Sequence, residues 1–411
     1  MARPIPTEVT VAAPVIVLVG VAILAAVGMA WALGANSNSP PFAPAIGANA
    51  ISTMRAAFLV GILAALGALT QGGAISETVG AELIDGVSIT PLAAIAGLLT
   101  AAAFMGMGVY SGYPIPAAFA TTGAMVGAGL ALGGDPAFAT YQRIGTFWVL
   151  VPPVSGGLAY GTARLLRSDR VPETVGVPFL AAIVGALIAN VRLGVIPSGP
   201  DSSQGSLAGF VARSIGGPAI GDVEVAALVA TAGAAIIGFW FIRRRTQASV
   251  ENGIRSFLVI LGSVVAFSSG GSQVGLATGP LENLFRAQLG LPGIALLGIG
   301  AAGILAGAWM GAPRLLQATS REYASLGIRR SIAALVPGFI IAQAAITLGI
   351  PISFNNIVIS GVIGGGLAAG TAGVSRRKIG VTIAFWLLTL VGATLVGYGL
   401  YTLLSAVLAT P

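Results

Sequence analysis

The sequence from Trp31 to Gly47, WALGANSNSPPFAPAIG, interrupts an otherwise apolar part of the chain. Proline lacks a backbone N–H and stops helices, while Gly, Asn and Ser favour turns. We therefore expect Gly34, Pro40 and Pro41 to break a helix here. Irregular backbone at membrane depth is tolerated only where it is packed inside protein or lines a wet cavity. The stretch thus predicts a buried polar site.

A second stretch of this kind, FSSGGSQVGLATGP, runs from Phe267 to Pro280. Gly270 lies 236 positions after Gly34. We expect a second helix break here, marked by Gly270, Gly271, Gly279 and Pro280. Two polar breaks at matching places in two halves of a chain are typical of the binding site of a secondary transporter.

The composition predicts a membrane protein. Of 411 residues, 56% are hydrophobic and only 8% are charged, whereas soluble domains carry roughly 25% charged residues. Apolar segments long enough to cross a bilayer, roughly 18 to 25 residues, recur along the chain. We expect an all-α polytopic membrane protein with about twelve spans, near 11–33, 56–73, 91–110, 114–133, 145–163, 176–196, 223–242, 255–268, 291–311, 331–349, 356–373 and 379–402.

The charges predict the orientation of these spans. With this span count, four arginine-rich clusters fall on one side of the membrane: 164–170, 243–255, 314–330 and 376–378. The positive-inside rule makes that side cytoplasmic. Most of the acidic residues between spans, and both chain termini, then fall outside. The expected location is the cell membrane.

The spans also form a repeat. Shifting the first five spans by 236 residues places them close to the last five. Seven spans separate the starts of the two copies, and an odd number predicts inverted topology with broken helices and hairpins. We therefore divide the chain into a first repeat (1–170), a connecting part (171–246) with an exposed loop near 198–222, and a second, inverted repeat (247–411).

Several function classes are excluded by missing residues. The chain contains no cysteine and no histidine, so it has no thiolate or imidazole with which to bind a metal, relay protons or attack a substrate. No nucleophile–base pair or metal cluster is evident, so we expect neither an enzyme nor a cofactor. There is no soluble basic domain, and hence no predicted nucleic-acid partner.

The two polar stretches resemble motifs of the inorganic phosphate transporter (PiT, Pho-4) family. That family carries a G-A-N-D-V-A-N-A-F-G-T motif once per inverted repeat, similar to Gly34-Ala35-Asn36-Ser37 and to Gly270–Gly271–Ser272–Gln273. Its L-G-G-x-V-T-E-T-I resembles Gln71 to Val79. Its P-V-S-T-T-H, followed by glycines, resembles Pro351 to Asn356 followed by Gly361–Gly366, and more weakly Pro114 to Phe119.

This sequence departs from the family pattern at charged and titratable positions. The motif aspartate is replaced by Ser37 in the first copy and by Gln273 in the second. Phe119 and Asn356 stand at the two histidine positions. The resemblance implies the fold, a role in anion transport and a homodimer, but it does not carry over the coupling ion.

The polar residues at the breaks are suited to binding an anion. A broken helix offers free backbone N–H groups and a positive dipole end without a full charge. Side-chain donors would add to these, and the substrate-binding residues we expect are Asn36, Ser37, Asn38, Ser272, Gln273, Ser353, Asn355 and Asn356. The alternative is that these side chains only cap broken helices and satisfy the backbone.

The coupling ion is less clear. Na⁺ prefers oxygen ligands that include a carboxylate, and neither motif contains one, so sodium as a coupling ion would bind weakly. Glu77 is the candidate for proton coupling, with surface helix capping as its alternative. Glu282 and Arg286, one turn apart, are expected to form an ion pair.

We expect a secondary transporter for inorganic phosphate or a related oxyanion, lying in the lipid bilayer and working by alternating access. Three alternatives remain open. These are an uncoupled, channel-like anion pathway, a sulfate permease, and a non-transporting sensor or scaffold with the same fold.

Overall fold

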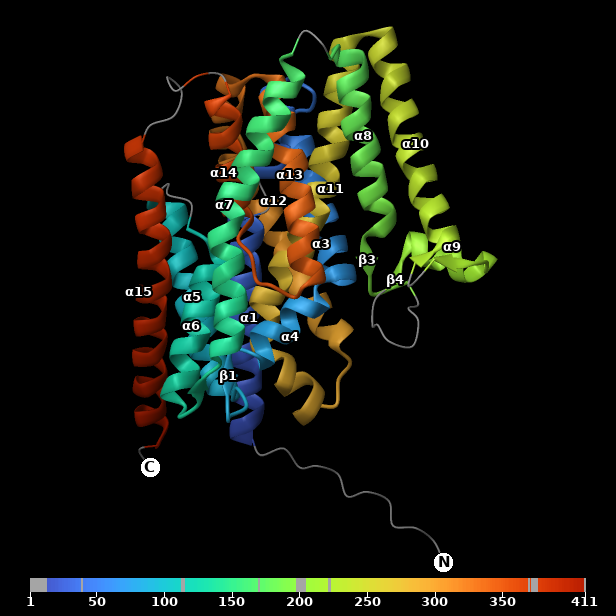
Figure 1. Ribbon diagram of the computed structural model, residues 1–411. Coiled ribbons are helices and arrows are strands. Elements are labelled where there is room, and N and C mark those ends of the chain that lie inside the picture. Colours follow the sequence, from blue (N-terminus) through green and yellow to red (C-terminus); the bar gives the residue numbers. More distant parts are fainter. Residues whose placement is uncertain are drawn as a thin grey trace, which may run out of the picture.

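The computed structural model describes residues 13–37, 40–111, 115–168, 171–196, 205–220, 223–368, 370 and 376–409. Long helices run side by side along one direction and form a bundle (Figure 1). The first group of helices is α1 (Ala13–Asn36), α2 (Ala43–Gly47), α3 (Thr53–Gln71), α4 (Gly73–Ala81), α5 (Pro91–Ser111), α6 (Ala117–Ala131) and α7 (Phe138–Leu166). The connecting helices are α8 (Glu173–Asn190), α9 (Leu207–Ile215) and α10 (Val225–Ala248). The last group is α11 (Val250–Thr278), α12 (Gly293–Leu326), α13 (Ile328–Thr347), α14 (Phe354–Leu367) and α15 (Arg376–Ala409).

The remaining elements are short. Three antiparallel strand pairs of two residues each lie between helices: β1 (Ile84–Asp85) with β2 (Asp135–Pro136), β3 (Arg192–Leu193) with β4 (Gly205–Ser206), and β5 (Ala219–Ile220) with β6 (Val223–Glu224). The elements η1 (Pro40–Phe42) and η2 (Gly279–Leu281) are single 3₁₀-helical turns, and η3 (Leu284–Gln288) is a π-helical turn.

The all-α membrane class is confirmed. In the described part of the chain, nine helices are long and apolar enough to cross a membrane. Each of the twelve expected segments falls on one helix. However, α6 and α14 have 15 and 14 residues, roughly 22 Å of helix against about 30 Å of hydrocarbon. The number of complete crossings therefore stays a prediction.

Helix starts recur at a constant interval. The helices α5 and α6 begin at residues 91 and 117, and α13 and α14 begin at 328 and 354, each 237 positions later. In Figure 1, α7 runs up the page and its counterpart α15 runs down. Both observations agree with the expected inverted repeat, and the division into three parts remains our interpretation.

The exposed connection expected near 198–222 contains more structure than an ordinary loop. Within its described residues lies the nine-residue helix α9, where Ala208 and Ala212 are buried. Ser206 caps this helix by accepting a hydrogen bond from the Gly209 N–H, 3.1 Å away. The two buried alanines are four positions apart and lie on one face of the helix, whereas Leu207, Phe210 and Ile215 are exposed.

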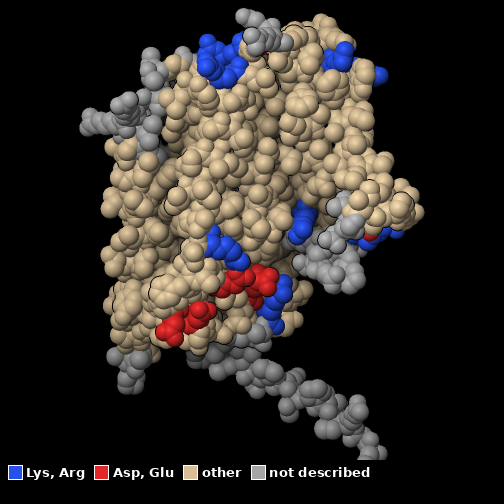
Figure 2. Space-filling model, in the orientation of Figure 1, with Lys and Arg blue, Asp and Glu red and all other residues tan. Residues whose placement is uncertain are grey.

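Charged residues gather toward the two ends of the bundle, and ion pairs that combine both signs occur at each end. On the face drawn in Figure 2, only basic residues lie over the upper end, and acidic residues gather toward the lower end. The end of α7, the end of α10 and the start of α13, with Arg167, Arg244 and Arg330, lie at the upper end (Figure 1). The start of α1 and the end of α15 both lie at the lower end.

Glycines bring two pairs of helices into backbone contact. A Cβ added at Gly34 of α1 would lie 2.2 Å from the carbonyl oxygen of Ile304 in α12. A Cβ at Gly270 of α11 would lie 1.9 Å from the carbonyl oxygen of Ala64 in α3. Only residues without a Cβ permit such close approach of two backbones. These crossings hold the two halves of the chain together.

This packing corrects part of the sequence prediction. Gly34, Gly270 and Gly271 were expected to break helices, but all three lie inside continuous helices. Their role in the structure is the close approach of neighbouring helices.

The interruptions lie further along the chain. The first helix, α1, ends at Asn36, and η1 begins at Pro40 with Pro41 following; α11 ends at Thr278, and η2 contains Gly279 and Pro280. Both ends lie shortly before prolines, which disfavour continuation of a helix. Proline alone does not end a helix in this structure, because Pro313 and Pro337 lie inside α12 and α13.

Candidate functional site

Three polar segments meet around the middle of α11. The Ser269 hydroxyl of α11 donates to the carbonyl oxygen of Ser37, in the turn after α1, at 3.5 Å. One turn along the same helix, the Gln273 amide Nε2 donates to the carbonyl oxygen of Ile352, just before α14, at 3.4 Å. The end of α1 and the start of α14 are therefore joined through α11. The structure brings together these three predicted segments; Asn38 lies outside the described residues.

The side chains of these segments are buried and only partly satisfied. Most of them are at most 4% exposed. The Ser272 hydroxyl donates to the Ser269 carbonyl within its helix, at 3.0 Å. Six other polar atoms have no hydrogen-bond partner among the described residues: Asn36 Nδ2, Ser37 Oγ, Gln273 Oε1, Ser353 Oγ, Asn355 Nδ2 and Asn356 Oδ1. Since a buried unsatisfied group costs about 1–3 kcal/mol, such a concentration points to a polar ligand site.

The start of α14 adds the backbone of a helix N-terminus. Ser353 is the N-cap residue, yet its side chain makes no capping hydrogen bond, and the first turn is buried. The first amides of a helix carry a partial positive charge and need acceptors. The site thus offers N–H donors from both backbone and side chains.

The electrostatic character of this site is neutral. Among the described residues, every buried polar side chain is uncharged. An anion would be held by aimed dipoles here, without an arginine or lysine counter-ion. Amides provide both donors and acceptors, because each carries one N–H₂ and one oxygen.

An amide chain beside the site was missed in the sequence. The Gln71 amide Nε2 donates to Gln343 Oε1 at 3.2 Å, and Gln343 Nε2 donates to the Ser268 hydroxyl at 2.6 Å. Gln71 Oε1 is buried without a partner among the described residues. This chain joins α3, α13 and α11. Two glutamines inside apolar helices were the available signal, since polar side chains within spans are costly and often functional.

Phe119, which stands where the family motif has a histidine, makes an apolar contact. Phe119 of α6 stacks on Trp148 of α7, with ring centroids 3.9 Å apart. The Trp148 indole N–H donates to the carbonyl oxygen of Pro351, before α14, at 2.8 Å. One turn further along α6, the hydroxyls of Thr121 and Thr122 are buried without partners among the described residues. Sequence analysis missed both, because they follow the family-like positions rather than occupy them.

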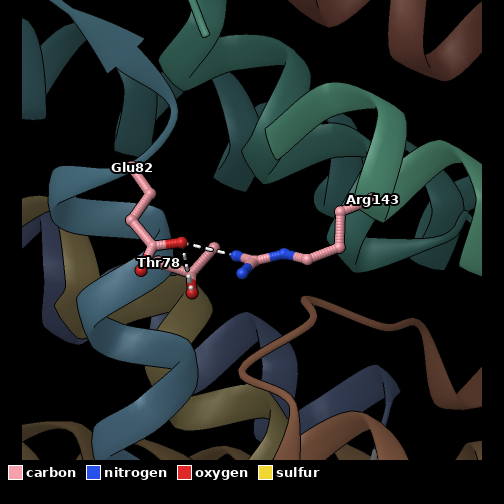
Figure 3. A network of polar contacts seen from close by, with 3 residues as sticks. All are labelled: Thr78, Glu82 and Arg143. Carbon is pink, nitrogen blue, oxygen red and sulfur yellow. Dashed lines mark hydrogen bonds and ion pairs between the residues drawn. The ribbon is translucent and has the colours of Figure 1, made fainter. Parts of the chain in front are cut away.

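A second polar network connects the end of α4 to α7 at the lower end of the molecule. Arg143 of α7 forms an ion pair with Glu82, at the end of α4, with Nη2 and Oε2 2.5 Å apart. The Thr78 hydroxyl donates to the same carboxylate oxygen at 3.3 Å (Figure 3). Tyr141 donates to the carbonyl oxygen of Leu83 at 2.6 Å. Burial raises the pKa of Tyr141, so it keeps its proton at neutral pH.

On its other side, α4 contacts the end of α11. The Ser76 hydroxyl donates to Glu282 Oε2 at 3.0 Å, and a Cβ at Gly80 would lie 2.1 Å from the Gly279 carbonyl oxygen. The expected ion pair between Glu282 and Arg286 is confirmed, at 2.5 Å. Glu77, in contrast, is exposed on α4, and its coupling role stays a prediction.

Comparison with known proteins places the chain in one family. The model of the phosphate transporter family matches residues 33–397. A Thermococcus kodakarensis protein that carries the name phosphate permease is 25% identical over 408 residues, covering 94% of this chain and 98% of its own length. The Arabidopsis thaliana chloroplastic inorganic phosphate transporter 2-1 is 25% identical over 405 residues, covering 89% of this chain and 69% of its own.

The fold is also found in a solved structure. A sodium-dependent phosphate transporter superposes with a TM-score of 0.80 at 21% identity, covering 95% of this chain and all of that one. Apolar helices of membrane-spanning length make this a multi-pass membrane protein. The relatives are transporters and not enzymes. On the match of the family model across most of its length, the chain belongs to the phosphate transporter family.

Proposed function

We propose that this chain is a secondary transporter for inorganic phosphate or a related oxyanion, and that it works by alternating access. One observation carries the proposal. Three uncharged segments, at the end of α1, the middle of α11 and the start of α14, converge with six buried polar atoms that lack partners among the described residues. The names of the relatives, phosphate permease and phosphate transporter, support the choice of anion.

In this proposal the oxyanion is held by neutral donors. The amides of Asn36 and Asn355 and the first backbone N–H groups of α14 donate to its oxygens. Phosphate at neutral pH carries a proton, and the amide oxygens of Gln273 and Asn356 accept it. An amide is a weaker acceptor than the carboxylate of the family motif. We therefore infer that this site discriminates against sulfate, which has no such proton, less strongly than a site with aspartates.

Alternating access requires one end of the site to close while the other opens. We propose that α4, held between Arg143 and Glu282, forms the closed lower end. The amide chain of Gln71, Gln343 and Ser268 links α3 and α13 to α11, so it would transmit movement between the halves. Both termini would lie outside, and two copies would form a homodimer; protease protection in sealed vesicles and light scattering of solubilised protein test these two points.

Sodium coupling is proposed to be weak or absent. The similar solved protein is described as sodium-dependent, but at this site only hydroxyl, amide and backbone oxygens are available to a cation among the described residues. Neutral oxygens bind Na⁺ less strongly than carboxylates. Glu77 remains the candidate for proton coupling.

The test is uptake of radiolabelled phosphate into proteoliposomes with and without a sodium gradient. We expect uptake by the wild type to change less than about threefold, equivalent to less than about 0.7 kcal/mol. The double variant Ser37→Asp with Gln273→Asp should gain sodium dependence, and Ser37→Asn with Gln273→Asn is the uncharged control of similar size. A wild type that requires sodium for uptake would refute weak coupling.

The same assay separates the alternatives. Flux at rates beyond a transporter's turnover, independent of any gradient, would indicate a channel-like pathway. Binding of phosphate by calorimetry without uptake would indicate a sensor or scaffold. Faster uptake of sulfate than of phosphate would indicate a sulfate permease.

A further inference from the structure

A cavity with several charged residues in its lining lies at the upper end of the molecule, away from the candidate site. Its volume is about 770 Å³, and it opens to the surface. The end of α7 and the starts of α8, α11 and α13 form its walls. Its charged lining residues are Arg167, Glu173, Glu251, Arg329 and Arg330.

The charges of this cavity do not balance. Arg329 forms an ion pair with Glu173, and Glu251 pairs with Arg255, outside the lining, at 2.7 Å. Arg167 and Arg330 have no carboxylate partner among the described residues. Arg167 donates one N–H to the carbonyl oxygen of Ala368, at 3.0 Å. The cavity is therefore left with two guanidinium groups that an anion can approach.

The first turn of α13 carries charges opposite to those of its neighbours. The first turns of α8 and α11 contain Glu173 and Glu251, which suit the positive end of a helix dipole. The first turn of α13 has no acidic residue and contains Arg329 and Arg330, with Gly327 as an N-cap that offers no side chain. Glu173 already pairs with Arg329, so Arg330 is the cation of this turn without a carboxylate partner among the described residues. A cation at a helix N-terminus is unfavourable unless an anion lies close by.

We propose that this cavity is a second anion site, which binds a doubly charged phosphate group between Arg167 and Arg330. Guanidinium groups match phosphate oxygens in charge and geometry. The volume exceeds that of one phosphate, so the group is either free phosphate with its hydration water or the headgroup of an anionic lipid.

The test measures binding to the full-length protein in vesicles of phosphatidylcholine alone. All variants carry Asn36→Ala and Asn355→Ala, so that binding at the candidate transport site is suppressed. We expect radiolabelled inorganic phosphate to bind, and Arg167→Gln with Arg330→Gln to weaken binding at least tenfold. Arg244→Gln removes an exposed charge at the same end without touching the cavity and serves as the control.

A second set of vesicles contains phosphatidic acid, and native mass spectrometry counts the retained lipids. Phosphate binding in phosphatidylcholine that depends on the two arginines identifies free phosphate as the ligand. Retention of phosphatidic acid that depends on them, without phosphate binding, identifies a lipid headgroup. Binding that is absent in both sets, or equally reduced by Arg244→Gln, overturns the proposal. Uptake by the protein with an intact central site is measured separately, so failure here does not refute transport.

Discussion

The ends of α1 and α11 can be compared residue by residue. The helix starts are 237 residues apart, which aligns Asn36 with Gln273 and Gly34 with Gly271. This differs by one residue from the motif alignment given above, in which Gly34 matches Gly270 and Ser37 matches Gln273. The helix α1 stops at Asn36, whereas α11 continues past Gln273 to Thr278. The first proline after Asn36 is Pro40, four residues later. The first proline after Gln273 is Pro280, seven residues later. The later position of this proline agrees with the later end of α11.

The two copies therefore present polar groups in different ways. Asn36 and Ser37 lie at a helix end and the turn after it, where backbone groups also become available. Gln273 projects from an intact helix, so only its side chain is available. Gly34 and Gly270 both serve helix packing, although at this interval Gly270 corresponds to Leu33. In these two stretches the glycines lie inside helices and the prolines lie just beyond helix ends.

The largest effect is expected from filling the glycine contacts. In Gly270→Ala the new Cβ would lie 1.9 Å from the Ala64 carbonyl oxygen, and in Gly34→Ala 2.2 Å from that of Ile304. Neither backbone can move away without separating the helices. We expect a loss of about 3 kcal/mol or more in stability, measured as a lower melting temperature and loss of folded protein on size-exclusion chromatography.

The matched control for this prediction is Gly20→Ala in α1, where nothing lies within 4 Å of the new Cβ. It should be neutral or slightly stabilising, because alanine is the better helix former. If Gly34→Ala and Gly270→Ala were as stable as Gly20→Ala, the two glycines would not be needed for helix packing. The earlier expectation that they interrupt the helices would then have to be considered again.

The sequence predicted which polar segments lie close together, and their role as a substrate site stays a prediction. Each of the twelve expected segments contains a helix, and α11 is hydrogen-bonded both to the turn after α1 and to the segment before α14. These inferences rest on hydropathy, proline and chain symmetry, which are local or periodic properties. The helix breaks assigned to Gly34 and Gly270 were wrong because glycine has two meanings, turn and close packing, and only the neighbouring helix decides between them.

The sequence did not predict which side chains of distant segments contact each other. Gln71 and Gln343 are 272 residues apart and join through one amide hydrogen bond. Gln71 was noted only as the first residue of a stretch that resembles a family motif, and no local pattern included Gln343. Glu82, at the end of α4, and Arg143 of α7 are likewise far apart in sequence and meet through one side-chain contact. A single sequence contains no information on which polar side chains will face each other across helices.

A smaller effect, on phosphate uptake, is expected when the polar side chain of Gln273 is replaced. Gln273→Leu keeps the volume but removes the hydrogen bond to the Ile352 carbonyl and the free Oε1. If Gln273 binds substrate from an intact helix, phosphate uptake should fall about tenfold, equivalent to about 1.4 kcal/mol of lost binding. Ser263→Ala, also in α11, removes a hydroxyl bonded only within its helix and should leave uptake unchanged. Equal uptake in both variants would exclude Gln273 from the site.

The role of proline predicts a local change. Pro280→Ala restores a backbone N–H and removes a ring that disfavours continuation of α11. We expect the helix to extend through residues 279–281, and hydrogen exchange there to slow about tenfold, while uptake falls only a few-fold. Pro313→Ala, within the continuous helix α12, should leave exchange at 279–281 unchanged. Unaltered exchange in Pro280→Ala would assign the end of α11 to tertiary packing instead.

The smallest effect is expected from breaking the Arg143–Glu82 ion pair, which has no counterpart at the equivalent positions of the second half of the chain. The positions equivalent to Glu82 and Arg143 are Thr319 and Gly380. The side chains of Arg143 and Glu82 are 44% and 39% exposed, and such pairs contribute at most about 1 kcal/mol. Arg143→Gln should therefore leave folding intact and change uptake less than about fivefold.

The sensitive measurement for this pair is access to the lower end. Because the chain contains no cysteine, a single Thr278→Cys reports access of a water-soluble thiol reagent without background. If the pair holds α4 closed against the end of α11, Arg143→Gln should increase the labelling rate a few-fold. Arg255→Gln, which breaks a similar exposed pair at the start of α11, should not. Equal labelling in the two variants would show that glycine packing alone closes this end, and that the charged contact of the first copy is not needed for it.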